Sequence, residues 1–339
     1  MNPGIPLRVV GVIAETADAV SIRLVADSGQ PVAYRPGQFL TLRIPSDRTG
    51  SVARSYSLSS APHEDGPLQV TVKRTVAGYG SNWLCDNATE EMIIDSLPPA
   101  GIFTPGSLDA DLLLCAAGSG ITPVLSIVKS VLARGTGHCT LIYANRDERS
   151  VIFADTLAEL AAAHPDRLTV VHWLQAVQGL PTARQLAALI RPWSQREIFV
   201  CGPVPFMDAV EAAADALGIE RTRVHSEKFL SLSGDPFAPV AAAPPETADG
   251  AAVTVEFDGA THEFAWPRET VLLDALLARG IEAPYSCREG ACSACVCRVA
   301  TGEVKLLRND VLEKEDLADG YVLACQAVPV TDTVRITYD

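Results

Sequence analysis

Four cysteines near the C-terminus constrain the fold of this chain more than any other feature of its sequence. Cys287, Cys292 and Cys295 form a C-x4-C-x2-C run, and Cys325 follows after 29 further residues. This spacing is typical of the ligands of a plant-type [2Fe–2S] cluster, which takes thiolates from one tight loop and one distant turn. Gly290 allows the loop to wrap, so that backbone N–H groups point at the sulfurs. The pattern therefore predicts an electron-transfer domain.

Two other uses of these cysteines fit the sequence less well. A structural zinc site usually combines two close pairs of ligands, whereas this chain has a triplet and a single cysteine. A disulfide framework conflicts with the odd count of nine cysteines and with a 339-residue chain, 48% hydrophobic, that can bury its own core. No secretory segment follows Met1, so we expect reduced thiols and a cytoplasmic protein.

The length and charge of the chain narrow its class further. A chain of 339 residues is long enough for two or three domains, and we expect three. The net charge of −14 argues against binding to nucleic acid or to an anionic membrane, and it suits a protein that meets a basic partner. The most apolar stretch, residues 112–128, is interrupted by glycines and Pro123, so we expect no membrane span.

The chain changes character at two points. Residues 1–107 contain short alternating strands between Pro and Gly turns, which predicts an antiparallel β-barrel. Residues 108–230 alternate buried strands with helices, which predicts a parallel α/β sheet. Residues 231–250 are rich in Pro and Ala and are interpreted as a linker. Residues 251–339 begin with a hairpin signal around Asp258-Gly259 and are expected to form an α+β module of the β-grasp type.

The predicted barrel carries a candidate flavin site. In the strand Arg54-Ser55-Tyr56-Ser57 the guanidinium suits a pyrophosphate, the ring can stack on an isoalloxazine, and the serine can hydrogen-bond to its polar edge. An ordinary strand with a surface arginine would give the same pattern. The stretch from Val72-Lys73 to Gly80-Ser81 adds a strand, a loop and a helix start with Ser81 as the expected cap, where N–H groups could receive a phosphate.

The predicted α/β domain carries a candidate nucleotide site. Gly118 to Pro123 follow the first buried strand and open a helix, which places a glycine turn where a dinucleotide pyrophosphate would lie. Cys201-Gly202-Pro203 follow a later strand and reach the same edge of the sheet. Both segments are also compatible with ordinary strand-to-helix turns, because the first departs from the G-x-G-x-x-G fingerprint.

With these motifs in this order, the chain resembles the ferredoxin–NADP reductase superfamily carrying a C-terminal ferredoxin domain. The segments 36–45, 71–75, 143–147 and 309–313 are similar to those of reductase components of bacterial 3-ketosteroid 9α-hydroxylase. Those components are in turn similar to the reductase subunits of phenylacetyl-CoA epoxidase, which remain the alternative together with reductases of other ring-hydroxylating oxygenases.

The resemblance implies a role for individual residues. It implies that FAD is held by Arg54, Tyr56, Ser57, Val72, Lys73, Gly80 and Ser81. It implies that the nicotinamide site is shaped by Gly118, Thr122, Pro123, Cys201, Gly202 and Pro203, with Glu227 and Phe229 at the position where the family places an aromatic ring near the flavin. The cysteine quartet would hold the cluster.

The expected activity follows from counting electrons. A nicotinamide delivers two electrons together as a hydride, whereas the cluster accepts one electron at a time. A flavin between them must therefore take up the pair and pass the electrons on singly. We therefore expect a monomeric reductase, without a catalytic side chain, that passes electrons to a Rieske-type terminal oxygenase. A pure electron-transfer module without flavin and a stand-alone enzyme for a small substrate are the competing classes.

The choice of nucleotide stays open on the residues alone. Arg146 could pair with a 2′-phosphate, whereas the neighbouring Asp147 would repel it. The resemblance implies NADH, with NADPH as the alternative.

Overall fold

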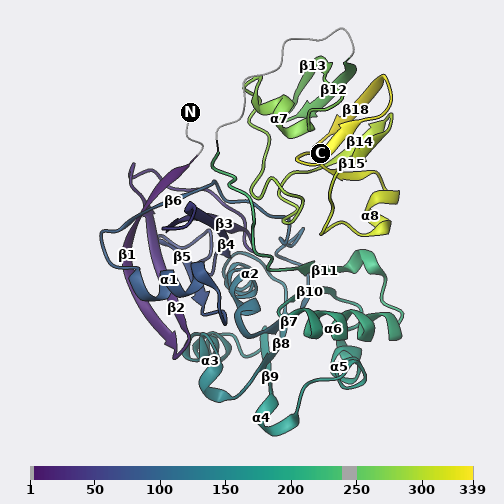
Figure 1. Ribbon diagram of the computed structural model, residues 1–339. Coiled ribbons are helices and arrows are strands. Elements are labelled where there is room, and N and C mark those ends of the chain that lie inside the picture. Colours follow the sequence, from purple (N-terminus) through teal and green to yellow (C-terminus); the bar gives the residue numbers. More distant parts are fainter. Residues whose placement is uncertain (1–3, 239–249, 339) are drawn as a thin grey trace. The chain divides into compact units, whose positions relative to one another are not determined.

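The structure, a computed structural model, describes residues 4–238 and 250–338 and is shown in Figure 1. The described residues fall into two compact units. One unit contains residues 5–44 and 54–229, and the other contains residue 4 together with residues 45–53 and 230–338.

The first part of the larger unit is built on a six-stranded sheet with the order β4-β3-β6-β1-β2-β5. Its pairings are antiparallel, and an isolated bridge between Leu58 and Val70 joins the end of β4 to β5, which confirms the expected antiparallel barrel. The elements are β1 (Ile5–Thr16), β2 (Ala19–Ala26), β3 (Phe39–Ser46), β4 (Gly50–Ser57), β5 (Leu68–Lys73), α1 (Tyr79–Asn87) and β6 (Ile93–Ser96).

The second part is a parallel five-stranded sheet with the order β11-β10-β7-β8-β9. Numbered along the chain and read from β9, this order is 3-2-1-4-5, the doubly wound arrangement of dinucleotide-binding folds. The strands are β7 (Leu112–Ala117), β8 (Cys139–Asn145), β9 (Leu168–Leu174), β10 (Glu197–Cys201) and β11 (Val224–Glu227). The helices are α2 (Ile121–Arg134), α3 (Ala154–Ala163), α4 (Gln175–Gln178), α5 (Ala183–Ile190) and α6 (Val204–Ala216), with short 3-10 turns η1 (Gly118–Gly120), η2 (Glu148–Ser150), η3 (Arg191–Trp193) and η4 (Arg221–Arg223).

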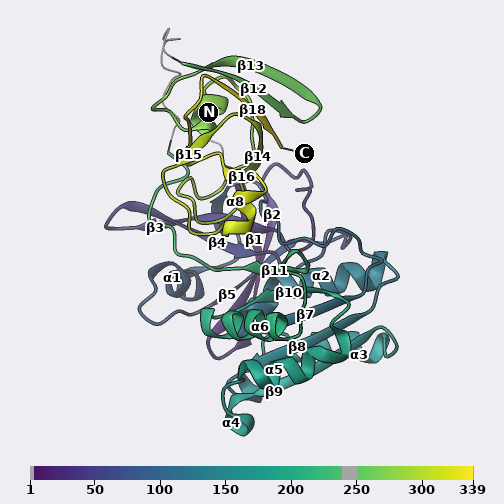
Figure 2. The same cartoon turned by 90° about the vertical axis from the view of Figure 1, so that its right-hand side faces the viewer.

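The parallel sheet is buried on both faces, as its apolar strands require. Alternate residues of β7 show the division: Leu112 and Leu114 belong to one core with α2 and α3, whereas Leu113 and Cys115 belong to the other with α5 and α6. Helices α5 and α6 lie side by side on their face of the sheet (Figure 2). The carboxyl ends of the strands are therefore left as the edge where loops can form a site.

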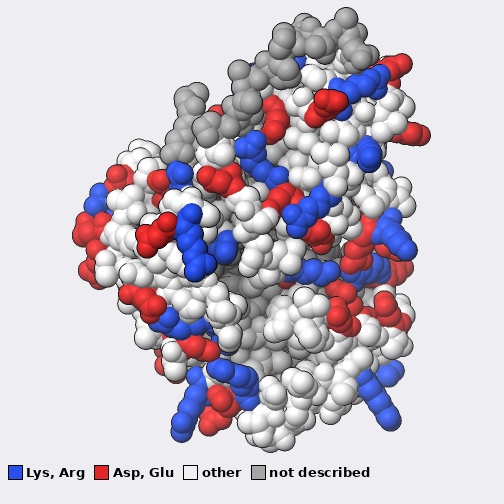
Figure 3. Space-filling view, in the orientation of Figure 1, with Lys and Arg blue, Asp and Glu red and all other residues white. Residues whose placement is uncertain are grey.

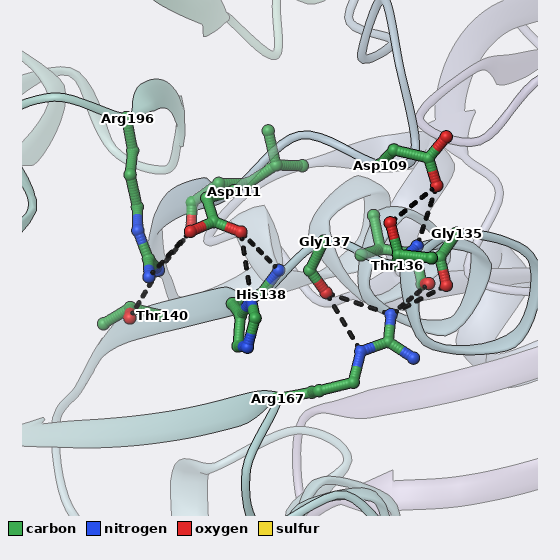
Figure 4. Close-up of polar contacts among 11 residues, drawn as sticks. Asp109, Asp111, Gly135, Thr136, Gly137, His138, Thr140, Arg167 and Arg196 are labelled. Carbon is green, nitrogen blue, oxygen red and sulfur yellow. Dashed lines mark hydrogen bonds and ion pairs between the residues drawn. The ribbon is translucent and has the colours of Figure 1, made fainter.

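The opposite edge of this sheet is fastened by polar residues that stand directly before the strands (Figure 4). Asp111 accepts hydrogen bonds from the backbone N–H and Nδ1 of His138, at 2.9 and 3.0 Å. Arg196 donates to Thr140 Oγ1 at 3.0 Å and also pairs with Asp111. Arg167 donates to the carbonyls of Val131, Leu132, Gly135 and Gly137 at 2.8–3.1 Å. These carbonyls belong to the end of α2 and the loop after it, so Arg167 caps that helix end.

The smaller unit contains the expected β-grasp module. Its five-stranded sheet has the order β13-β12-β18-β14-β16, with β12 and β18 parallel and the other pairs antiparallel. The elements are β12 (Ala251–Phe257), β13 (Ala260–Trp266), α7 (Leu272–Leu277), β14 (Val296–Thr301), β15 (Val304–Leu306), α8 (Lys314–Ala318), β16 (Tyr321–Leu323), β17 (Ala327–Pro329) and β18 (Thr333–Thr337). Helix α7 packs on this sheet around the buried Trp266.

Part of the expected linker is packed within the smaller unit. Leu232 and Phe237 are buried, at 6% and 4% exposure. The Glu289 carboxylate accepts from the backbone N–H groups of Ser233 and Gly234, at 2.9 and 3.1 Å. Residues 231–238 are thus tied to the loop that carries Cys287. The expectation of a tether over residues 239–249 lies outside the described residues.

The surface in Figure 3 carries acidic and basic side chains intermingled rather than in separate fields, despite the net charge of −14. Within residues 4–238 and 250–338, no helix has the length and apolar character needed to cross a membrane.

The contacts of Arg167 predict its contribution to stability. Arg167→Ala leaves several partly buried carbonyls without their charged donor, so we expect the free energy of unfolding to fall by about 3 kcal/mol. Urea unfolding of the variant measures this. Arg184→Ala, on the exposed face of α5, is the matched control and should change stability by less than about 0.5 kcal/mol. Equal effects of the two substitutions would contradict the assigned role.

Candidate cofactor sites

The two predicted turns of the nucleotide site meet at the point where the strand order reverses. Strands β7 and β10 are neighbours, with Ala116 paired to Cys201, so the segments that follow them leave the sheet together. Gly120 packs directly on the second segment: a Cβ at this position would lie 2.1 Å from the Cys201 carbonyl oxygen. Only glycine fits there. The crevice at such a switch point is where open α/β sheets bind ligands.

Polar contacts fix the first turn. Tyr143, from β8, donates its Oη–H to the Gly118 carbonyl at 3.0 Å, and Thr122 Oγ1 donates to the Ser119 carbonyl at 3.0 Å. The N-cap residue of α2 is Gly120, which has no side chain to cap the helix, and α2 begins at Ile121, directly before Thr122 and Pro123. Pro203 likewise stands at the N-cap position of α6. The backbone of this edge is therefore suited to an anionic group such as a pyrophosphate.

A hydrogen bond links the predicted flavin strand to the nucleotide sheet. Ser57 Oγ, at the end of β4, donates to Glu227 Oε2 at 3.0 Å. Glu227 ends β11 and is paired in register with Cys201 on β10. Three residues that the sequence analysis assigned to different cofactors, Ser57, Cys201 and Glu227, are thus brought together.

The electrostatics of this cluster favour uncharged side chains. Burial raises the pKa of Glu227 to about 8, and the hydrogen bond from Ser57 opposes that shift only in part. Burial also raises the pKa of Cys201 well above its ordinary value. Glu227 therefore keeps its proton at neutral pH, and Cys201 remains a thiol.

The flavin strand contacts the start of α1. The aliphatic part of Arg54 lies against Gly80, where an added Cβ would fall 2.8 Å from Arg54 Cγ. Burial raises the pKa of Tyr56 well above its ordinary value, which keeps its hydroxyl neutral. The expectation that Ser81 caps α1 is wrong: the N-cap residue is Gly78, and Ser81 lies inside the first turn, where its Oγ accepts from the Thr75 N–H at 3.1 Å. Helix N-termini need a partner for each early N–H, and here the loop, not Ser81, defines the start.

The remaining flavin candidates lie on β5. Val72 is fully buried in the barrel, whereas the Lys73 side chain reaches toward the glycine turn: its Nζ would be 3.6 Å from a Cβ at Gly118. Partial burial lowers the pKa of Lys73, and the nearby carboxylate of Asp18 opposes this. Phe229, two residues after β11, is 46% exposed and available for stacking.

The cysteine loop has the backbone geometry that its spacing predicts. Gly290 has a φ of +79°, and a side chain there would meet the Arg308 carbonyl at 2.9 Å. The N–H groups of Glu289 and Ala291 point at Cys287 Sγ, at 3.4 and 3.3 Å, and the Cys287 N–H points at Cys292 Sγ at 3.4 Å. N–H groups aimed at sulfur stabilise thiolate ligands.

The four thiols form a chain of contacts in which Cys292 and Cys325 touch Cys287, and Cys295 touches Cys325. Hydrogen bonds from the Cys292 and Cys325 thiols lower the pKa of Cys287. The same hydrogen bonds raise the pKa values of Cys292 and Cys325. Among the described residues, no group of three or more His, Cys, Asp and Glu side chains is arranged to hold a single metal ion. Four buried or half-buried sulfurs with backbone donors are the donor set that a [2Fe–2S] cluster takes.

Sequence reasoning missed three residues that shape these sites. Tyr143 anchors the glycine turn, Asp18 lies between Lys73 and Arg146, and Glu289 holds the segment before the module. Each acts through a partner far away in the chain. The only local signal was a polar residue at or near the end of a strand or inside the cysteine run.

Family models match three consecutive parts of the chain. They are "Oxidoreductase FAD-binding domain" over residues 7–104, "Oxidoreductase NAD-binding domain" over residues 114–212 and "2Fe-2S iron-sulfur cluster binding domain" over residues 255–330. Together with the barrel, the doubly wound sheet and the cysteine loop, they define the class: a flavin-dependent iron–sulfur reductase with FAD, NAD and [2Fe–2S] domains in one chain.

Similar curated proteins narrow this class. A "3-ketosteroid-9-alpha-monooxygenase, ferredoxin reductase component" from Rhodococcus rhodochrous is 57% identical over 98% of this chain and 96% of its own length. One from Mycolicibacterium smegmatis is also 57% identical, with the same coverage. A component of 1,2-phenylacetyl-CoA epoxidase from Escherichia coli is 34% identical over 98% of this chain and 97% of its own. The chain belongs to the family of 3-ketosteroid-9-alpha-monooxygenase ferredoxin reductase components.

Solved structures agree on the fold. Full-length CYP116B46 from Tepidiphilus thermophilus is similar over 98% of this chain and 42% of its own, with a TM-score of 0.68 and 27% identity. Phthalate dioxygenase reductase, whose structure is described as modular for electron transfer from pyridine nucleotides to [2Fe–2S], matches 99% of this chain and 100% of its own. Its TM-score is 0.59 at 22% identity, which shows the fold alone.

The raised pKa of Glu227 predicts a pH dependence of stability. The unfolded chain releases this proton near the ordinary value of 4.5, whereas the folded chain holds it until about pH 8. Between these values the native state binds more protons, so stability falls as pH rises. Glu227→Gln removes this loss, and the wild type should lose up to about 1.4 kcal/mol per pH unit relative to the variant.

Urea unfolding at a series of pH values from about 5 to 9 measures this difference. Glu220→Gln, at an exposed position before β11, is the control and should follow the wild type. Wild-type and Glu227→Gln curves that run parallel across this range would show that Glu227 ionises normally.

Proposed function

We propose that this chain is the reductase component of a 3-ketosteroid 9α-hydroxylase, which takes electrons from NADH and delivers them to a Rieske-type terminal oxygenase. The observation that carries the proposal is the 57% identity to such components over 98% of the chain. The relative from the epoxidase stands at 34% over a similar length, which favours the steroid system over the epoxidase. We further propose a monomer that works in the cytoplasm.

The division of labour follows the domain order. We propose an FAD-binding domain over residues 1–107, an NAD(P)-binding domain over 108–230, a linker over 231–250 and a ferredoxin domain over 251–339. When bound, the cofactors supply hydride transfer from nicotinamide to flavin and single-electron transfer from flavin to the iron–sulfur centre. The side chains supply position, charge and exclusion of water.

For FAD, the proposed contacts are those of β4, β5 and α1. The contact between Arg54 and Gly80 supports placing a guanidinium beside the first turn of α1, where a pyrophosphate would receive both charge and N–H donors. Tyr56 would stack on the isoalloxazine, and Ser57 would meet its polar edge. The proposal also includes Val72, Lys73 and Ser81.

For the nicotinamide, the proposed site is the switch-point crevice formed by Gly118, Thr122, Pro123, Cys201, Gly202 and Pro203. Gly120 supports it, because its close packing on Cys201 holds both turns at one edge. Glu227, protonated at neutral pH, would donate a hydrogen bond in this region without adding charge. Phe229, partly exposed just after β11, would supply an aromatic ring near the flavin.

The cluster ligands in this proposal are Cys287, Cys292, Cys295 and Cys325. The backbone donors around Cys287 support it, since they would stabilise the charge on ligand sulfurs. Cys297, two residues after Cys295, is left out of the ligand set because it lies inside β14, paired in register with Val322, whereas Cys295 belongs to the loop before that strand.

Reconstitution tests the function directly. The holoprotein, NADH and the terminal oxygenase of a 3-ketosteroid hydroxylase should together give hydroxylated steroid, with product formed in step with NADH consumed. The same reductase with a phenylacetyl-CoA epoxidase should give little product. Higher coupling to the epoxidase would favour the alternative partner, and turnover of a small substrate without any oxygenase would contradict the reductase role.

The order of the relay predicts the effect of losing one ligand. Cys292→Ser should abolish reduction of a one-electron acceptor such as cytochrome c, while stopped-flow absorbance still shows rapid reduction of FAD by NADH. Cys297→Ala is the matched control and should keep the electron paramagnetic resonance signal of the reduced cluster. Loss of FAD reduction in correctly folded Cys292→Ser would place the flavin after the cluster and contradict the proposed order.

A further inference from the structure

An ion pair joins the flavin barrel to the loop after the second strand of the nucleotide sheet. Asp18, in the turn between β1 and β2, accepts from Arg146 Nη2 on its Oδ2 at 2.9 Å. The same oxygen lies 4.0 Å from Lys73 Nζ. Asp18 therefore stands between two cations, one from each domain of the larger unit.

The position of Asp18 is fixed by its surroundings. Thr16 Oγ1 donates to Asp18 Oδ1 at 2.9 Å, and the Asp18 carbonyl accepts from the Arg74 N–H at 2.7 Å. The Asp18 side chain is 28% exposed, whereas that of Arg146 is 62% exposed. The Asp18 carboxylate is thus fixed by the barrel, and the more exposed Arg146 side chain extends to it.

The position of Arg146 in the fold connects this ion pair to the proposed nucleotide site. Arg146 directly follows β8, the second strand of the sheet, next to the glycine turn after β7. In doubly wound folds the residues at the end of this strand meet the ribose 2′ position, where an acidic residue suits a 2′-hydroxyl and an arginine suits a 2′-phosphate. Arg146 alone would therefore favour NADPH.

The acidic neighbour in sequence does not supply the opposing charge. The Asp147 side chain caps η2 and accepts from the Ser150 N–H at 2.9 Å. Its Oδ1 is thus engaged with the backbone of its own turn, and among the described contacts it forms no ion pair with Arg146. The carboxylate that engages the Arg146 guanidinium is the one from the barrel.

We infer that Asp18 is a specificity-determining residue that disfavours nucleotides carrying a 2′-phosphate by occupying and neutralising Arg146. A dianionic phosphate at Arg146 would have to displace Asp18 or share the guanidinium with it, and like charges a few ångströms apart repel each other. A nucleotide with a free 2′-hydroxyl meets no such barrier. This inference rests on the proposed nucleotide site.

Asp18→Asn tests the inference, because it removes the charge and keeps the shape. In the FAD-loaded holoprotein, with ferricyanide as acceptor, we expect the ratio of kcat/KM for NADPH to that for NADH to rise about tenfold, mainly through a lower KM for NADPH. The gain should shrink as ionic strength rises. Asp18→Asn combined with Arg146→Gln should lose the gain.

Two further variants complete the design. Asp27→Asn breaks a barrel ion pair, that of Asp27 with Arg8, away from the glycine turn and should leave the ratio within twofold of wild type. Arg146→Gln alone leaves Asp18 without its guanidinium partner, so the ratio should fall below that of wild type even if Asp18→Asn does not fold.

The outcomes separate the inference from the function it rests on. FAD reduction in Asp18→Asn with an unchanged nucleotide ratio overturns the role of Asp18 alone, as does a ratio in Arg146→Gln that stays level or rises. A wild-type flavin that neither NADH nor NADPH reduces overturns the proposed function and this inference with it.

Discussion

The hydrogen bond from Ser57 to Glu227 is the contact on which the proposed chemistry depends. Hydride transfer needs donor and acceptor in van der Waals contact, so the strand proposed to hold the flavin must meet the sheet edge proposed to hold the nicotinamide. Ser57 ends β4 of the barrel, and Glu227 ends β11 beside Cys201. The packing of Gly120 on Cys201 then leaves no room for a side chain between the two turns. The Ser57–Glu227 hydrogen bond and the absence of a side chain at Gly120 thus bring the two candidate sites next to each other.

The two edges of the nucleotide sheet have opposite characters. At the amino edge Arg167 donates to the carbonyls at the end of α2, and Arg196 donates to the Leu112 carbonyl and pairs with Asp111, which fastens the strands and the end of α2 in place. At the carboxyl edge the turns are short and glycine-rich, and no described side chain caps α2. The charges near the carboxyl edge, Lys73, Asp18 and Arg146, come from both domains, which is why the specificity residue that we propose belongs to the barrel.

Most of the features that could be predicted from the sequence are determined by residues close together in the chain. The cysteine run and Gly290 specify a loop geometry that the structure shows, and the alternation of buried strands with helices specified the parallel sheet. Pairings between distant residues could not be read in this way: Ser57 and Glu227 are 170 positions apart, and Asp18 and Arg146 are 128 apart. Ser81 was misplaced as a cap because a serine near a helix start gives the same local pattern whether it precedes the helix or lies in its first turn. The packing of Leu232, Ser233 and Phe237 could not be predicted, because the sequence around them has no periodic apolar pattern.

The central claim is that one chain accepts electrons in pairs and releases them singly. An anaerobic titration of the holoprotein with NADH, followed by absorbance and by electron paramagnetic resonance, tests it most directly. We predict uptake of about three electrons per chain, two on the flavin and one on the iron–sulfur centre, with the resonance signal of a reduced [2Fe–2S] cluster appearing during the titration. Uptake of about two electrons with the cluster still oxidised after excess NADH would contradict it, because the flavin would then not be connected to the cluster.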